Sequence, residues 1–94
     1  MGVPTITLPG ETFASRHSLS HLCNVGLDDW VARDIDHYVA LTIEKSANLA
    51  ALAQTRADLR ERTKASALCN APRFGKNLGD NLRKAWRDYC KLPA

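Results

Sequence analysis

Apolar and β-branched residues open the chain and stop at a proline–glycine pair. The segment from Val3 to Leu8 reads Val-Pro-Thr-Ile-Thr-Leu, and Pro9 and Gly10 follow it. This composition and partial alternation predict a short strand that runs into a tight loop. No later segment of the sequence is a convincing partner, so we expect either an edge separated from a larger sheet or pairing with a second copy.

Apolar residues at helical spacing predict helices over the rest of the chain, because each run is bounded by a capping residue or a stop signal. A short turn or a single helical turn at residues 30–32 separates the first helix from the second. The predicted helices cover residues 14–24 before a stop at Gly26, 35–46 after the cap Asp34, 49–65 after the cap Asn48, and the stretch between the cap Asn70 and Pro93.

Three of these helices carry an apolar face that we expect to be buried. In the last helix, Gly75 and Gly79 each cost about 1 kcal/mol relative to alanine, and their shared face favours close approach of another backbone. The pattern predicts a mainly α chain with one short N-terminal β-strand. The three apolar faces are Ile35, Val39, Thr42 and Ile43; Leu49, Leu52 and Leu59; and Phe74, Leu78, Leu82, Ala85, Trp86 and Tyr89.

Composition limits the class of protein. The 94 residues are 45% apolar and 24% charged, which excludes disorder and allows one small domain or a piece of a larger one. No apolar run reaches the roughly 18–20 residues of a membrane span, and the opening residues lack the pattern of a secretory signal. We expect a single segment over residues 1–94, located in the cytoplasm and not in a membrane.

The cysteines and histidines do not form a metal-binding pattern. Cys23, Cys69 and Cys90 are far apart, so we interpret them as buried or half-buried apolar residues in a reducing compartment. His17 and His21 are one helical turn apart, but no third ligand lies at a suitable spacing. The sequence predicts no metal site.

Charge is distributed unevenly along the chain. The formal net charge is +3; residues 1–59 hold four Lys or Arg and seven Asp or Glu, and residues 60–94 hold nine and three. The basic face between Arg56 and Lys91 suggests a small helical module that binds nucleic acid or an anionic protein. Acids alternate with many of these bases and the aromatic residues lie on the apolar stripe, so we favour a solvated helix surface and do not expect nucleic acid to bind.

The loop between the predicted strand and the first helix is a candidate ligand-binding feature. Gly10 permits close approach of a ligand to the backbone, Glu11 can accept from a hydroxyl, and Arg16 can bind a phosphate or pair with Glu11. Thr12 and Ser15 can cap the helix or contact a ligand. Taken alone, this pattern is more typical of an ordinary capped turn.

The longer stretch from Gly2 to Arg16, GVPTITLPGETFASR, changes that interpretation. It resembles the segment G-x-P-x-V-T-x-P-G-E-T-x-A-S-R near the C-terminus of the O-linked N-acetylglucosamine transferase family, the SPINDLY-like glycosyltransferases that usually follow tetratricopeptide repeats. The similarity covers essentially all 94 residues, and the alanine- and arginine-rich style looks like the bacterial members. Further matches lie at residues 24–27, 36–39, 49–62, 67–74 and 86–90.

The resemblance implies the C-terminal part of a Rossmann-like α/β donor domain in a GT-B enzyme. Members of this family invert the sugar's configuration as they move N-acetylglucosamine from UDP to a Ser or Thr hydroxyl of a protein. The family's His-Thr-Thr-Gly-x-Asp motif is expected just upstream of this segment, so we expect a fragment that is inactive alone and needs no cofactor. We assign no catalytic residue to it.

By the same resemblance, six residues correspond to the family's loop beside the UDP-sugar pocket: Pro9, Gly10, Glu11, Thr12, Ser15 and Arg16. We expect Thr12 and Ser15 to shape the wall of that pocket. The last helix is expected to pack toward the other domain of the parent enzyme. Without that domain, Trp86 and Tyr89 are expected to promote self-association.

Overall fold

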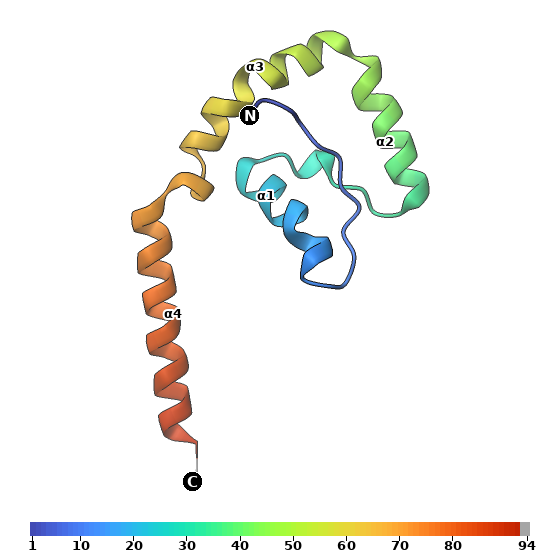
Figure 1. Cartoon of the computed structure of the whole chain (residues 1–94). Helices are drawn as coiled ribbons and strands as arrows, with labels where there is room; N and C mark the ends of the chain where they lie inside the picture. Colours follow the sequence, from blue (N-terminus) through green and yellow to red (C-terminus); the bar gives the residue numbers. More distant parts are fainter. Residues whose placement is uncertain (93–94) are drawn as a thin grey trace.

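The computed structural model describes residues 1–92 and is built almost entirely from helices (Figure 1). These residues form three short 3-10 turns and four α-helices. No helix among the described residues is both long and apolar enough to cross a membrane. In chain order the elements are η1 (Ala14–Arg16), α1 (His17–Val25), η2 (Asp28–Trp30), α2 (Ile35–Ala47), α3 (Leu49–Ala65), η3 (Ala67–Cys69) and α4 (Ala71–Lys91).

The predicted starts of α2, α3 and α4 are confirmed by their capping interactions, whereas the helix predicted over residues 14–24 is the 3-10 turn η1 followed by α1. The side chain of Asp34 accepts a hydrogen bond from the backbone N–H of His37 at 2.7 Å, and the caps Asn48 and Asn70 accept equivalent bonds at 3.0 Å. Gly26 ends α1 in the left-handed conformation with φ 78°, which glycine adopts without a steric penalty. The predicted closure by Pro93 lies outside the described residues.

The predicted N-terminal β-strand and the Rossmann-like α/β domain are both wrong, because the described residues contain no strand or sheet. Thr7 and Val31 form one isolated parallel bridge. In it Thr7 donates to the carbonyl of Trp30 at 3.2 Å and accepts from the N–H of Ala32 at 2.7 Å. The pairing stops there because η2 ends at Trp30 and the cap of α2 follows at Asp34. A partner segment this short cannot extend a ladder.

A small core holds the N-terminal segment between α1 and α3. Leu22, Leu27, Trp30 and Leu59 are buried against one another, and they come from α1, the following turn and α3. Figure 1 shows the N-terminal segment crossing the body inside the arch formed by α2 and α3. Four partly buried residues complete this cluster: Ile6, Val25, Val31 and Leu52.

Several predicted core positions are exposed instead. The face of α2 formed by Ile35, Val39, Thr42 and Ile43 points to solvent, and Leu41 is the residue of this helix that is buried. Leu49 is also exposed at the start of α3. The side of α2 that meets α3 and the η2 region therefore differs from its most apolar side. The prediction of buried cysteines is wrong too, since Cys23, Cys69 and Cys90 are all exposed.

The chain is elongated because α4 projects from the body (Figure 1). Its principal extents are 60 × 30 × 15 Å and its radius of gyration is 17.9 Å, whereas a compact domain of this length has a radius of about 12 Å. Helix α4 leaves η3 and runs away from α1 and α2. Its predicted apolar face is formed as expected, but the described part of the chain does not bury it.

Candidate donor-site loop

The loop before α1 is closed by its own hydroxyl groups. The backbone N–H of Ser15 donates to Thr12 Oγ1 at 3.3 Å, and the Thr12 hydroxyl donates to Ser15 Oγ at 2.9 Å. Ser15 Oγ then donates to the backbone carbonyl of Thr12 at 2.9 Å. Both hydroxyls are therefore engaged within the turn, and they fix the path by which the chain enters η1.

Gly10 is required by close packing inside this turn. A Cβ atom placed on Gly10 would lie 2.6 Å from Ser15 Oγ and 3.0 Å from Ser15 Cβ, closer than non-bonded carbon and oxygen atoms approach. The Arg16 guanidinium also donates to the carbonyl of Gly10 at 3.1 Å. Glycine at position 10 thus allows the tight packing of the loop, and the hydrogen bond from Arg16 connects Gly10 to the residue that precedes α1.

Polar groups of this loop remain available to a ligand. Glu11 is exposed and makes no ion pair within residues 1–92. Arg16 uses one nitrogen for the Gly10 carbonyl and is otherwise exposed, so its remaining N–H groups can bind an anionic oxygen. Pro9 is half-buried beside them. The structure therefore brings all six predicted residues into one surface loop.

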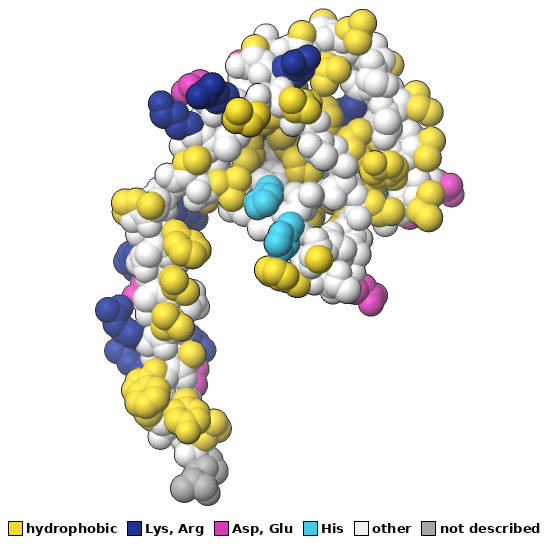
Figure 2. All heavy atoms as spheres, viewed as in Figure 1, with side chains coloured by type: hydrophobic (Ala, Val, Ile, Leu, Met, Phe, Trp, Pro, Cys, Tyr) yellow, Lys and Arg dark blue, Asp and Glu magenta, His cyan; other side chains and the backbone are white. Residues whose placement is uncertain are grey.

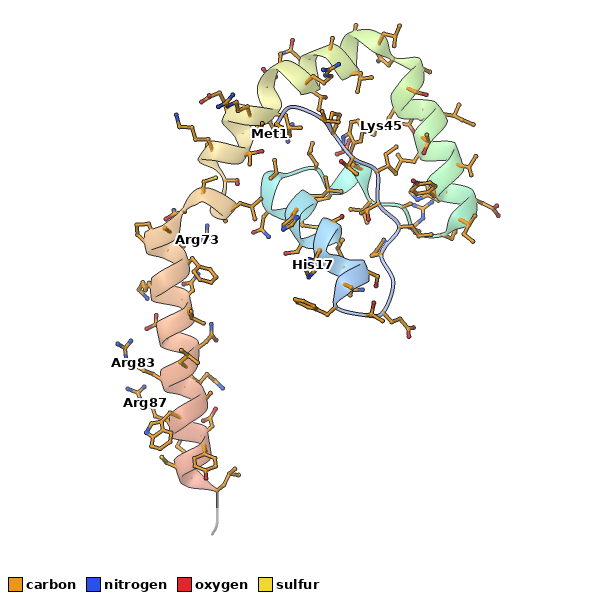
Figure 3. All side chains as sticks on the ribbon, viewed as in Figure 1. Met1, His17, Lys45, Arg73, Arg83 and Arg87 are labelled. Carbon is orange, nitrogen blue, oxygen red and sulfur yellow. The ribbon has the colours of Figure 1, made fainter. Side chains whose placement is uncertain are left out.

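A row of aromatic rings lies beside the loop, and the sequence analysis named its two histidines but not Phe13. The rings of Phe13 and His17 meet edge to face with centroids 4.4 Å apart, and His21 follows at 6.4 Å from His17. Figure 2 shows histidine side chains at the surface, and Figure 3 shows His17 on α1. The three rings lie four residues apart in the sequence, and this spacing could have predicted that they share one side of the helix. Within residues 1–92, no group of three His, Cys, Asp or Glu side chains is placed to hold a metal ion.

The comparisons with known proteins agree with the resemblance seen in the sequence. The profile of glycosyl transferase family 41 matches residues 1–78. Two plant relatives are named "Probable UDP-N-acetylglucosamine--peptide N-acetylglucosaminyltransferase SPINDLY". The one from Arabidopsis thaliana is 37% identical over 91 residues, and the one from Petunia hybrida is 40% identical over 90 residues.

These matches cover nearly all of this chain and a small part of each relative. They span 97% and 96% of the chain and 10% of each plant protein. A "UDP-N-acetylglucosamine--peptide N-acetylglucosaminyltransferase" from Caenorhabditis elegans is 28% identical over 94% of the chain and 8% of its own length. The chain thus spans about a tenth of the length of the curated relatives it matches. That it is of the bacterial type stays a prediction. The family profile and these relatives together show that the chain belongs to glycosyl transferase family 41.

Proposed function

We propose that this chain is the C-terminal portion of a transferase that moves N-acetylglucosamine from UDP to Ser or Thr hydroxyls of proteins. The observation that carries the proposal is the family match, supported by relatives named as UDP-N-acetylglucosamine–peptide transferases. These relatives are about ten times as long as the aligned segment. The UDP-sugar and the protein acceptor are therefore proposed for the parent enzyme.

Within that parent, we propose two roles for the loop at residues 9–16. Thr12 and Ser15 shape the wall of the donor pocket, because their hydroxyls are already bonded to each other and to the backbone. Glu11 and Arg16 face the donor, because both side chains are exposed and retain free hydrogen-bonding capacity. A guanidinium suits the UDP phosphates, and a carboxylate suits a sugar hydroxyl.

We propose that the 94-residue chain has no transferase activity by itself. Its four core residues hold the N-terminal segment in place, and the candidate loop lies on an exposed surface where water competes for every polar contact. Catalysis of glycosyl transfer depends on preorganised groups in a site that excludes water. The expected contribution of this segment is therefore to the wall of a site that other parts of the enzyme complete.

A titration followed by amide NMR tests the role of the loop. Addition of UDP-N-acetylglucosamine is expected to shift the amide signals of residues 10–16 with weak, millimolar affinity, corresponding to about −4 kcal/mol. Arg16→Gln should abolish the shifts, whereas the matched control Arg60→Gln on the exposed side of α3 should leave them unchanged. Absence of any shift in the loop of the unmodified chain would refute direct donor contact by Glu11 and Arg16.

A further inference from the structure

A pocket inside the arch of α2 and α3 is lined by residues from four segments of the chain. Its volume is about 360 Å³, within the range of roughly 300–1,000 Å³ that is typical of sites for small molecules. The N-terminal segment, η2, α2 and α3 each contribute to its wall, so the pocket depends on how the fold brings these segments together. None of the described residues that line it belongs to the candidate loop at residues 9–16.

Most of the wall of this pocket is apolar. Val3, Pro4 and Ile6 line it from the N-terminal segment, and Trp30 and Leu52 line it from η2 and α3. Trp30 is a buried core residue, whereas Val3 exposes 68% of its surface, so part of this apolar wall still meets water. A ligand with an apolar body would gain free energy by covering it.

The polar side chains of the pocket favour an anionic ligand. The hydroxyl of Thr42 donates to the carbonyl four residues before it at 2.7 Å, and the hydroxyl of Ser46 donates to the carbonyl three residues before it at 3.1 Å. Both hydroxyl protons are therefore engaged, and the side-chain donors left to a ligand are the Lys45 ammonium and the Arg56 guanidinium. No carboxylate is among the described residues that line the pocket.

The two cations of the pocket differ in how far their charge is already compensated. Lys45 lies on the inner side of α2 (Figure 3), where its Nζ pairs with the Asp29 carboxylate at 2.5 Å and lies 5.1 Å from the centre of the Trp30 ring. Arg56 is exposed and makes no ion pair within residues 1–92. Its guanidinium can therefore bind a carboxylate through two parallel N–H groups. Arg56 supplies the uncompensated positive charge of this pocket.

We propose that this pocket binds a small aromatic carboxylate. An aromatic ring suits the apolar wall because it buries apolar area next to the Trp30 indole at little cost in conformational entropy. The carboxylate accepts hydrogen bonds from Arg56, and the Lys45 ammonium adds to the positive potential of the pocket. This proposal does not depend on the proposed transferase function.

Tryptophan fluorescence of the 94-residue chain carrying Trp86→Phe tests the binding, because Trp30 is then its only tryptophan. Trp86 exposes 65% of its surface and does not line the pocket, so this change should preserve the fold. Phenylpropionate should change the emission of Trp30 with a Kd of about 1 mM. Phenylpropanol, which carries the same ring without a charge, should bind about tenfold more weakly, and phenylpropylamine more weakly still. No response to phenylpropionate, or equal affinity for the three compounds, would overturn the proposal.

Substitutions at Arg56 test which group selects the anion. Arg56→Gln should weaken the binding of phenylpropionate about tenfold and leave that of phenylpropanol unchanged. Arg56→Glu should reverse the order of affinities, so that phenylpropylamine binds more tightly than phenylpropionate. Because Arg56 is exposed, circular dichroism should show the same helices in both variants. Loss of helix alone would not reverse the order, so the reversal separates recognition from folding.

Arg60→Gln and Arg60→Glu are the matched controls. Arg60 is exposed one turn further along α3 and does not line the pocket, and its substitutions change the net charge as those of Arg56 do. They should leave the three affinities unchanged. Equal effects at the two arginines would mean that net charge alone attracts the anion, contrary to the proposal.

Two competing ligands separate the other occupants. Octanoate that binds more tightly than phenylpropionate would assign the pocket to an acyl chain and overturn the aromatic class. UDP-N-acetylglucosamine should not displace phenylpropionate, because the candidate donor loop contributes no residue to this wall. Displacement would make the pocket part of the donor site and would also overturn the proposal.

Discussion

Leu59 is the core residue whose removal tests the packing of the body most directly. It lies on α3 with 7% of its surface exposed and packs with Leu22, Leu27 and Trp30. Leu59→Ala removes three buried carbon atoms at about 0.8 kcal/mol each and leaves a cavity. Because this core is shallow and can relax, we expect a loss of about 2–3 kcal/mol in the free energy of unfolding.

Leu49→Ala is the matched control on the same helix. Leu49 exposes 72% of its surface, so the same change of side chain removes little buried area and should cost about 0.5 kcal/mol. Leucine and alanine both have high helix propensity, so the exchange itself changes the propensity of α3 little. The difference between the two variants therefore reports burial alone.

Urea unfolding followed by circular dichroism measures both values. A small domain of this length has a total stability of about 5–14 kcal/mol, so the loss at Leu59 should lower the midpoint clearly. In thermal unfolding it corresponds to roughly 10–20 °C. Equal destabilisation by Leu49→Ala and Leu59→Ala would refute the arrangement in which α3 turns Leu59 toward Trp30 and Leu49 toward solvent.

Other predictions follow from single contacts. Asn48→Ala should lower the free energy of unfolding in urea by about 1 kcal/mol through loss of the cap of α3. Asn48→Asp should retain most of that stability, because aspartate also caps helices. Gly10→Ala should destabilise the loop and shift its amide signals, and Ser15→Gly in the same chain should relieve the clash. The chain should release no UDP from UDP-N-acetylglucosamine above a blank; measurable turnover would disprove its inactivity. A gel-shift assay should detect no binding to RNA or DNA at micromolar concentration, even at low salt. The reason is that Asp80 and Asp88 pair with four of the six basic residues on α4. Binding that weakens as salt is added would instead support the alternative of a nucleic-acid-binding basic face.

Part of the geometry of the candidate loop could be predicted from its sequence. The spacing of Gly10, Thr12 and Ser15 predicted a capped turn, and the family resemblance suggested a donor-site wall. The structure shows why residue 10 is glycine: a Cβ atom there would lie too close to Ser15 Oγ. It also shows that the Arg16 side chain donates to the Gly10 carbonyl. The bond of Arg16 to Gly10 and the contact of Phe13 with His17 were not expected, because side-chain direction depends on how η1 joins α1.

Sequence alone determined where the helices lie and where α2, α3 and α4 begin. Caps such as Asp34, Asn48 and Asn70 act on backbone groups three residues away, so their effect can be read without knowing the fold. The family was also evident, since the stretch from Gly2 to Arg16 carries it directly.

Only the tertiary structure decided which faces are buried. The most apolar side of α2 points to solvent and Leu41 points inward, because the position of α3 and of the Thr7–Val31 bridge selects the inner side. The predicted strand became a single bridge because its partner is confined between Trp30 and Asp34. Burial and strand pairing depend on residues far away along the chain, and local patterns carry no information on where those residues lie.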